Sequence, residues 1–248
     1  MKPAFLCGPR RSHPWSKGLG TVGPKKHGQA EVLDTALDES LEALYRLAGP
    51  DAALPVKALA QKLRISRAEA VERVVRLQAL GLVTSNPTLE LSVTDAGAAW
   101  GATRIRRHRL VERLLHDHLG LPWELVHEEA ARIAPGISSA LEERLDTVLG
   151  RPGTCPHGNP IPALDGSVKA EPATPLDRLR PGSKGAIASI LQEESSLLRY
   201  LAALGLFPKT ELEVEEVAPM GGPIVVKVGA SRYALGREVA SRILVRKA

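Results

Sequence analysis

A Pro- and Gly-rich stretch near the middle of the chain limits its fold more than any other feature. Residues 150–175 contain six prolines and four glycines, a composition that favours an extended linker over a helix or a strand. Before this stretch, apolar residues recur at helical spacing. After it, short strand-like runs alternate with Gly/Pro turns. We therefore predict an α+β multidomain protein, mainly helical in its first part and ending in a small β-barrel.

The helical part begins with a pattern that is typical of a winged helix-turn-helix. Leucines at helical spacing predict a helix over 34–48, and a second helix follows over 55–63. A third helix begins at Ser66, which forms a predicted capping box with Glu69. Two short strands, LVTS and LELSV, follow it. This order makes the third helix the expected recognition helix.

Three further helices are predicted over 95–119, 122–134 and 138–149, the last one opened by a capping box from Ser139 to Glu142. Beyond the linker, the runs GAIASIL, ELEVEEV, PIVVKV, SRYAL and RILVRK predict strands, and SLLRYLAAL predicts a helix. The expected division is a basic disordered tail (1–30), a winged helix-turn-helix (31–98), an all-α unit (99–150), the linker (151–175) and the small β-barrel (176–248).

Charge is distributed unevenly along the chain. Six Lys and Arg and no acidic residue lie in 1–30, which leaves 27 basic and 28 acidic residues in the rest. The net charge of +5 therefore reports the tail, and nucleic-acid binding has to be argued from local clusters. Residues 55–80 carry such a cluster. Its candidate DNA contacts are Lys57, Arg64, Ser66, Arg67, Arg73 and Arg76, whereas Glu72 either accepts from a cytosine or faces away.

His108 and Glu112 are the most distinctive polar residues of the helical part. Four residues apart, they share a helix face whose other members, Ile105, Leu115 and Leu119, are apolar. Burying both polar groups without partners costs several kcal/mol, on the order of 2–7 for each. A divalent cation would satisfy both, and His127 on the next predicted helix supplies a third ligand. For each of these residues taken alone, an ordinary hydrogen-bonded side chain remains an alternative interpretation.

Several classes of protein do not fit the sequence. No apolar run approaches the length of a membrane span, and no secretory signal opens the chain. The two cysteines, Cys7 and Cys155, are too few for a disulfide framework, so we expect a cytoplasmic protein. We expect no enzyme, because no general base accompanies the His/Glu trio.

The stretch from about 34 to 165 resembles the diphtheria-toxin-repressor family of iron- and manganese-dependent regulators. The matching pieces are SVTDAGAAW, RHRLVERLL, LPWELVHEEA, SSALEERLDTVLG and CPHGNPIP. The last unit resembles the SH3-like domain of that family, which ferrous-iron-transport accessory proteins also carry, through LRYLAALGLFPKTELEVEEV, GGPIVVKVG and YALGREVASRILV.

The resemblance implies a homodimer that binds a palindromic DNA operator when it holds metal, Fe(II) or Mn(II), with Zn(II) also possible. It implies two metal sites in each subunit. The ancillary site maps onto His108, Glu112 and His127, with Glu194 from the SH3-like domain as the best fourth ligand and Glu193 as its alternative.

The principal site of the family departs from the pattern in this chain. Its ligands on the helix after His127 fall on Ala131, Ala134 and Pro135, which cannot bind a metal. On the first helix, Glu39 and Glu42 stand at the corresponding positions as possible weak ligands. The sequence leaves open a repressor that senses metal through the ancillary site alone and a metal-independent winged-helix regulator with a structural or vestigial site. A metal-dependent hydrolase and a non-DNA interaction scaffold are more remote.

Overall fold

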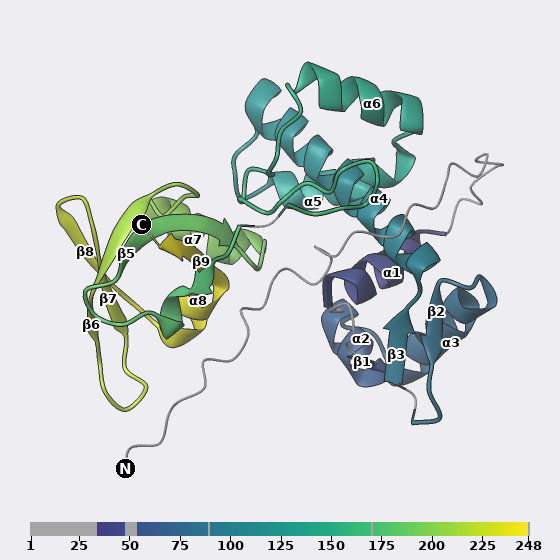
Figure 1. The fold of residues 1–248 in the computed structure, drawn as a ribbon, viewed down its shortest axis with the longest axis horizontal. Helices are drawn as coiled ribbons and strands as arrows, with labels where there is room; N and C mark the ends of the chain where they lie inside the picture. The colour runs from purple at the N-terminus through teal and green to yellow at the C-terminus, as the bar shows by residue number, and fades with distance from the viewer. Residues whose placement is uncertain (1–33, 48–53, 89, 170, 248) are drawn as a thin grey trace, which may run out of the picture.

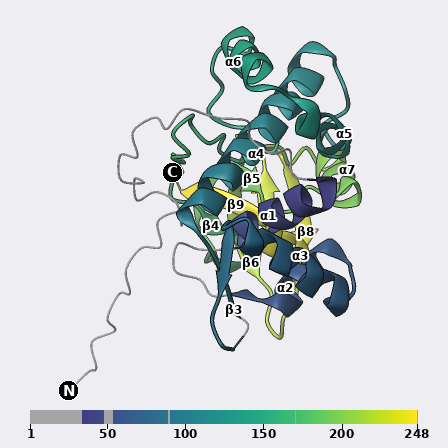
Figure 2. The same cartoon turned by 90° about the vertical axis from the view of Figure 1, so that its right-hand side faces the viewer.

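The computed structural model describes residues 34–47, 54–88, 90–169 and 171–247, so the predicted basic tail (1–30) lies outside the described residues. Three units are visible in Figure 1: a winged-helix unit, a helical unit and a C-terminal sheet unit. The long helix α4 (Asp95–Arg113) leaves the winged-helix unit, packs against α1 and reaches α6 of the helical unit (Figure 2). This helix is the element that places one unit relative to the next.

The winged-helix unit has the predicted order of elements. They are α1 (Thr35–Leu47), β1 (Leu54–Pro55), α2 (Val56–Leu63), α3 (Arg67–Ala79), β2 (Val83–Ser85) and β3 (Glu90–Val93), with a small antiparallel sheet in the order β1-β3-β2. Ser66 caps α3, because its Oγ accepts from the backbone N–H of Glu69 at 3.1 Å. Only this half of the capping box forms, since the Glu69 carboxylate takes the guanidinium of Arg73 at 2.6 Å.

The helical unit consists of the end of α4, α5 (Val126–Ile133), η2 (Ala134–Gly136) and α6 (Ser139–Val148). A five-residue π-helical segment, η1 (Leu114–His118), follows α4. Ser138, and not the predicted Ser139, caps α6 by accepting from the N–H of Leu141. The sequence offers two adjacent serines, and only the backbone geometry decides which of them stands just before the helix.

The C-terminal unit is a six-stranded antiparallel sheet in the order β4-β9-β5-β6-β7-β8. Its strands are β4 (Thr174–Pro175), β5 (Lys184–Ile190), β6 (Glu211–Val217), β7 (Ile224–Val228), β8 (Ser231–Leu235) and β9 (Ile243–Lys247), with η3 (Leu176–Arg178), α7 (Ser195–Ala203) and α8 (Arg237–Arg242) between them. The buried core draws on the sheet, on α7 and on Trp123 of the helical unit. Trp123 therefore links the helical unit to the core of the sheet unit, whereas the rest of the helical unit packs around a core of its own.

The start of the Pro/Gly-rich stretch is packed, and the expectation of an extended linker is wrong there. Cys155, His157 and Asn159 are buried, and Thr154 forms a bridge with Pro160. Arg113 of α4 donates to the carbonyl oxygens of Thr154 at 2.7 Å and of Cys155 at 3.3 Å. The prolines leave backbone carbonyls without helix or strand partners, and arginines of α4 satisfy them.

Candidate metal centre

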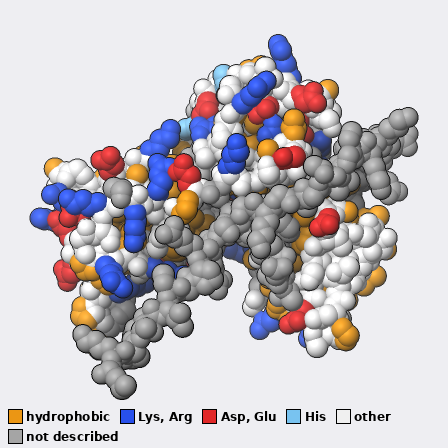
Figure 3. Space-filling model, viewed as in Figure 1, with side chains coloured by type: hydrophobic (Ala, Val, Ile, Leu, Met, Phe, Trp, Pro, Cys, Tyr) orange, Lys and Arg blue, Asp and Glu red, His pale blue; other side chains and the backbone are white. Residues whose placement is uncertain are grey.

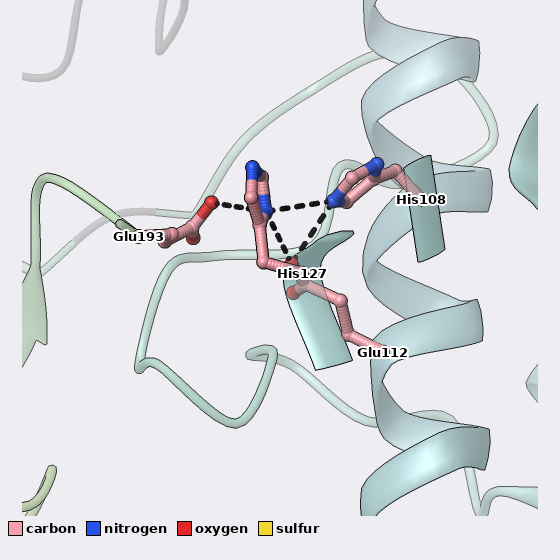
Figure 4. A group of neighbouring side chains, drawn as sticks. All are labelled: His108, Glu112, His127 and Glu193. Atoms are coloured by element: carbon pink, nitrogen blue, oxygen red, sulfur yellow. Dashed lines mark hydrogen bonds and ion pairs between the residues drawn. The ribbon is translucent and has the colours of Figure 1, made fainter. Parts of the chain in front are cut away.

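Four side chains from three separate segments converge between the helical and sheet units (Figure 4). His108 and Glu112 lie one turn apart on α4, and His127 is the second residue of α5. Glu193 comes from the loop between β5 and α7. The side chains of His108, Glu112 and Glu193 are almost completely buried, whereas His127 is partly exposed.

The arrangement of atoms around His127 Nδ1 favours a bound cation. Its Nδ1 lies 2.9 Å from Glu112 Oε1, 2.8 Å from Glu193 Oε2 and 2.9 Å from His108 Nε2. A single proton on Nδ1 can be donated to only one of these three atoms. Neighbouring ligands of a transition-metal ion stand about 3 Å apart when each is about 2.1 Å from the ion. The spacing therefore suits a shared metal ion better than a shared proton.

A second group of potential ligands overlaps the first. Cys155 and His157 lie close to the same two carboxylates, Glu112 and Glu193, with all four ligand atoms within 4.8 Å of one another. His157 Nδ1 is 3.7 Å from both Glu112 Oε2 and Glu193 Oε1. We call the six side chains together the His/Glu/Cys cluster: His108, Glu112, His127, Cys155, His157 and Glu193.

Hydrogen bonds outside the cluster orient two of its members. His157 Nε2 donates to the carbonyl oxygen of Trp123 at 3.0 Å, which leaves Nδ1 to face the cluster. Asn159 Nδ2 donates to Glu193 Oε1 at 2.6 Å and to the carbonyl of Ile190 at 3.0 Å. A backbone carbonyl behind a histidine and an amide behind a carboxylate are the partners that commonly fix metal ligands.

The pKa values of the cluster residues reflect two buried carboxylates that attract positive charge. Burial works to raise the pKa of Glu112, but His108 and His127 outweigh it and hold this pKa well below its usual value. Burial likewise opposes the protonation of His127, yet its bonds to Glu112 and Glu193 raise its pKa to about 9. Burial raises the pKa of the Cys155 thiol. Against the effect of its burial, the same two carboxylates raise the pKa of His157.

One buried atom shows that these partners are not sufficient. Glu112 Oε2 is buried and accepts no hydrogen bond within the described part of the chain, an arrangement that costs about 1–3 kcal/mol or more for a charged group. The donor set of three imidazoles, two carboxylates and a thiol fits a divalent transition metal, and such an ion would satisfy this oxygen. When bound, the ion would supply positive charge that draws the carboxylates of two units together.

The structure brings together the predicted trio of His108, Glu112 and His127. The fourth partner is Glu193 and not Glu194, whose carboxylate lies 3.4 Å from the guanidinium of Arg64. Glu194 begins α7 as its N-cap residue and is directed outward, so one backbone position decides which glutamate enters the cluster.

Glu39 and Glu42, the possible weak ligands, lie outside the cluster. Glu39 is exposed and 3.8 Å from Arg73 Nη1. Glu42 accepts from Arg46 Nε at 2.9 Å. Neither belongs to a group of described side chains close enough to share an ion. At the three expected principal-site positions, Ala131 and Pro135 are exposed and Ala134 is buried in the core of the helical unit.

Sequence reasoning missed Cys155, His157 and the supporting Asn159. Their positions lie in the stretch interpreted as a linker, where no periodicity indicates burial. The run CPHGNPIP, which carried part of the family resemblance, contained the signal: it places a Cys and a His, two residue types that bind transition metals, close together in the sequence.

The predicted DNA contacts divide into two groups. Arg73 and Arg76 have partners within the winged-helix unit: Arg73 donates to the carbonyl of Ala36 at 3.1 Å, and Arg76 pairs with Asp34, just before α1. Lys57, Ser66 and Arg67 are exposed at the surface of α2 and at the start of α3. Arg64, in the turn between these helices, is exposed and pairs with Glu194 across the unit boundary.

Two family models match the chain. Residues 94–163 match the iron dependent repressor, metal binding and dimerisation domain, which begins at the N-cap of α4 and ends just after the buried His157 loop. Residues 174–247 match the FeoA domain, which covers the six-stranded sheet unit.

The chain is also similar to whole proteins along most of its length. It is 33% identical over 230 residues to the iron-dependent repressor IdeR of Mycobacterium leprae, covering 88% of this chain and 99% of that one. It is 30% identical over 208 residues to the diphtheria toxin repressor of Corynebacterium jeikeium, covering 74% and 86%. A solved manganese-dependent transcriptional repressor in complex with manganese aligns with a TM-score of 0.79 at 31% identity, over 86% of this chain and all of that one. Together with the three-unit fold and the buried ligand cluster, these similarities show that the chain belongs to the family of metal-dependent repressors that includes IdeR and the diphtheria toxin repressor.

Proposed function

We propose that this protein is a homodimeric repressor that binds a palindromic DNA operator of metal-homeostasis genes in response to Fe(II) or Mn(II). The observation that carries the proposal is the His/Glu/Cys cluster, with six potential ligands and a buried carboxylate oxygen on Glu112 that accepts no hydrogen bond from the residues that the structure describes. The cluster also joins two units, because Glu193 comes from the loop between β5 and α7 of the sheet unit.

Fe(II) or Mn(II) is the expected physiological ion, with Zn(II) as a competitor. His108, Glu112, His127 and Glu193 offer nitrogen and oxygen donors, which suit both expected metals. Cys155 adds a thiol that favours softer ions. Solved relatives include a complex with manganese and forms of ScaR with bound Cd²⁺ and Zn²⁺, so ligand sets of this family accept several divalent ions.

Side-chain contacts connect the cluster with the DNA-binding unit. Arg46 of α1 places Nη1 3.4 Å from Glu193 Oε2, while its Nε donates to Glu42 on the same helix. Arg73 of α3 in turn donates to Ser40 of α1 at 3.3 Å. A change in the position of Glu193 would therefore be felt by α1 and then by the recognition helix. For this to act as a switch, the metal must bind the DNA-competent arrangement more tightly than the other.

The exposed face of α3 is the proposed surface for reading DNA. It presents Arg67, Val71, Glu72 and Val75, which can contact phosphate, thymine methyl groups and a cytosine amino group. In the view of Figure 3, Lys and Arg gather mainly over the sheet and helical units, and the winged-helix unit shows mostly uncharged side chains.

A dimer is supported by apolar side chains that the single chain leaves exposed. Within the helical unit these are Leu119, Leu125, Ile133, Leu141 and Val148. Burying them against a second copy would remove apolar surface from water, and a two-fold dimer presents two recognition helices to a palindrome.

We further propose that the protein works in the cytoplasm, because the operator DNA of bacterial repressors lies there. Within the described residues, none of the helices combines the length and apolar character that a membrane crossing requires.

The test is a titration of operator binding by Mn(II) and by Fe(II) under reducing, anaerobic conditions, starting from chelator-treated protein. The duplex is selected from a random library in the presence of metal. We expect tight binding only with metal, and loss of the metal response in His108→Ala. Equal operator affinity before and after chelation would leave a metal-independent regulator, with the cluster as a structural site. No binding to any duplex at low salt would contradict the DNA-binding proposal itself.

A further inference from the structure

Arg104 of α4 lies where the winged-helix and helical units meet. Its Nη2 is 2.6 Å from Asp38 Oδ2 on α1, and its Nη1 donates to the carbonyl of Pro135 in η2 at 3.3 Å. The side chains of Arg104 and Asp38 are 11% and 9% exposed. One guanidinium thus joins three elements, α1, α4 and η2.

Trp100, one turn earlier on α4, completes this arrangement. Its Nε1 donates to Asp38 Oδ1 at 3.1 Å, so both oxygens of the carboxylate are engaged. The Arg104 guanidinium carbon lies 5.6 Å from the centre of the Trp100 ring, within the range of a cation–π contact. The side chain of Arg104 is therefore fixed by charge, by hydrogen bonds and by packing.

Net stability does not explain why this pair is buried. Burial raises the pKa of Asp38 even though Arg104 and Trp100 counteract it, and burial lowers the pKa of Arg104 despite the attraction of Asp38. In both groups the loss of hydration outweighs the partner. Buried pairs of this kind often contribute little to folding compared with apolar side chains, although breaking one half is costly. A role in positioning the units accounts for the pair better than a role in stability.

The position of Arg104 matters because the expected principal metal site does not fit this chain. The residues at the three expected ligand positions have no metal-binding side chains, and one of them, Pro135, gives its carbonyl to Arg104. The acidic residues of α1 that would face such an ion are occupied: Glu42 binds Arg46, and Glu39 lies near Arg73. Arg104 already supplies a cation between α1 and η2.

We propose that Arg104 is a built-in cation that replaces the second metal ion of the family, so that α1 is joined to η2 permanently and the His/Glu/Cys cluster alone responds to metal. An arginine stays charged at any physiological pH and offers five donors in a fixed plane, which suits a carboxylate and a carbonyl at once. This inference rests on the proposed function.

The first test locates the ions directly. Crystals of the protein grown with Mn(II) are measured at a wavelength that gives manganese anomalous scattering. We expect anomalous density within the His/Glu/Cys cluster and none near Asp38 and Pro135. A manganese peak between α1 and η2 would overturn the proposal.

The second test separates metal binding from operator binding. Arg104→Leu should bind Mn(II) with the affinity of the unaltered protein, because Arg104 contributes no ligand to the cluster. At saturating Mn(II) its operator affinity should fall by at least about 10-fold, within the usual range for coupling between sites. Arg104→Lys keeps the positive charge but not the planar guanidinium with its several donors, and should give an intermediate loss of operator affinity. Because Arg104→Leu leaves Asp38 buried without its partner, both variants are first checked by circular dichroism and thermal unfolding.

Arg107→Leu is the matched control, since Arg107 is also a largely buried arginine of α4 but pairs with Glu142 and donates to Ser139, both in α6. It should keep metal-dependent operator binding. Unchanged operator affinity in folded Arg104→Leu, an equal loss in Arg107→Leu, or a parallel fall in Mn(II) affinity would each overturn the proposal. Failure of the unaltered protein to bind any operator with Mn(II) would instead contradict the proposed function.

Discussion

Two neighbouring glutamates show how much a single residue position decides. Glu193 is buried with its carboxylate shared among His127, Arg46 and Asn159, whereas Glu194 lies at the surface beside Arg64. Both have the same chemistry, and both precede α7. The family resemblance favoured Glu194 over Glu193, and the loop after β5 has no period from which the direction of either side chain could be predicted.

The pair provides a sharp test of the cluster. Glu193→Gln should lower Mn(II) affinity by at least about 10-fold, since even partners behind the ligands commonly contribute that much. Glu194→Gln, one residue away, should leave the affinity unchanged. Isothermal titration calorimetry of the chelator-treated variants with Mn(II) measures both affinities. Similar losses in the two variants would show that Glu193 is no ligand and that the loop as a whole matters.

Glu72 offers a second test, on base recognition. It is exposed on α3, and no hydrogen bond or ion pair with the described residues engages its carboxylate. A carboxylate accepts from the amino group of cytosine, while an amide pairs with adenine. Glu72→Gln should therefore change one position in each operator half-site from C towards A, as read by sequencing selected duplexes. Val75→Ala is the control that should keep the cytosine. An identical preference in Glu72→Gln would exclude Glu72 from readout.

Helices and strands themselves followed closely from periodicity and turn residues. The predicted helices over 34–48 and 55–63 are α1 and α2, and all five predicted strands of the last unit are present. A departure occurs after Arg113, where the wider π-helical turn of η1 breaks the four-residue spacing. Leu119, predicted to share the face of His108, is consequently 61% exposed. A local change of helix type cannot be foreseen from apolar spacing.

The loop that carries Cys155 and His157 was harder to predict, because its burial depends on residues far away in the sequence. The N–H of Ile190 in β5 donates to the carbonyl of His157 at 3.0 Å. Gly158 adopts a φ of +83°, and a Cβ there would lie 2.1 Å from the carbonyl oxygen of Ala188. Only a glycine permits this approach of the loop to the sheet.

Gly158→Ala should therefore separate the loop from β5. The positive φ alone costs about 1–3 kcal/mol, so the free energy of unfolding in urea should fall by at least that amount. Mn(II) affinity should fall too, because His157 moves with the loop. Gly153→Ala, where an added Cβ meets nothing within 4 Å, serves as the control. A stable Gly158→Ala protein with normal metal binding would contradict this account.

At the scale of the whole molecule, Trp123 fastens the helical unit to the sheet unit. Its ring belongs to the core of the sheet unit, with its centre 5.0 Å from the centre of the Phe207 ring. Its Nε1 donates to the carbonyl of Pro156 at 3.1 Å. One side chain thus contacts both the sheet unit and the loop that carries Cys155. The distance between Glu193 and the ligands of α4 depends on this packing.

Replacing Trp123 should affect metal binding although Trp123 is no ligand. Trp123→Ala should lower the free energy of unfolding by about 3–5 kcal/mol, as is usual for a buried aromatic residue, and should weaken Mn(II) binding at temperatures where the protein is still folded. Tyr200→Ala, at a 43% exposed aromatic residue of α7 in the sheet unit, is the control. Unaltered Mn(II) affinity in folded Trp123→Ala would show that the docking of the two units does not set the geometry of the cluster.

The two overlapping ligand groups also bear on how such a molecule can tell metals apart. Both groups contain Glu112 and Glu193, but one adds two imidazoles and the other adds an imidazole and a thiol. An oxygen-preferring ion and a sulfur-preferring ion would therefore bind at different positions within the His/Glu/Cys cluster. The first would draw α5 towards Glu193, and the second would draw the Cys155 loop. Discrimination would then lie in which segment moves, so an ion can bind tightly and still give the wrong signal.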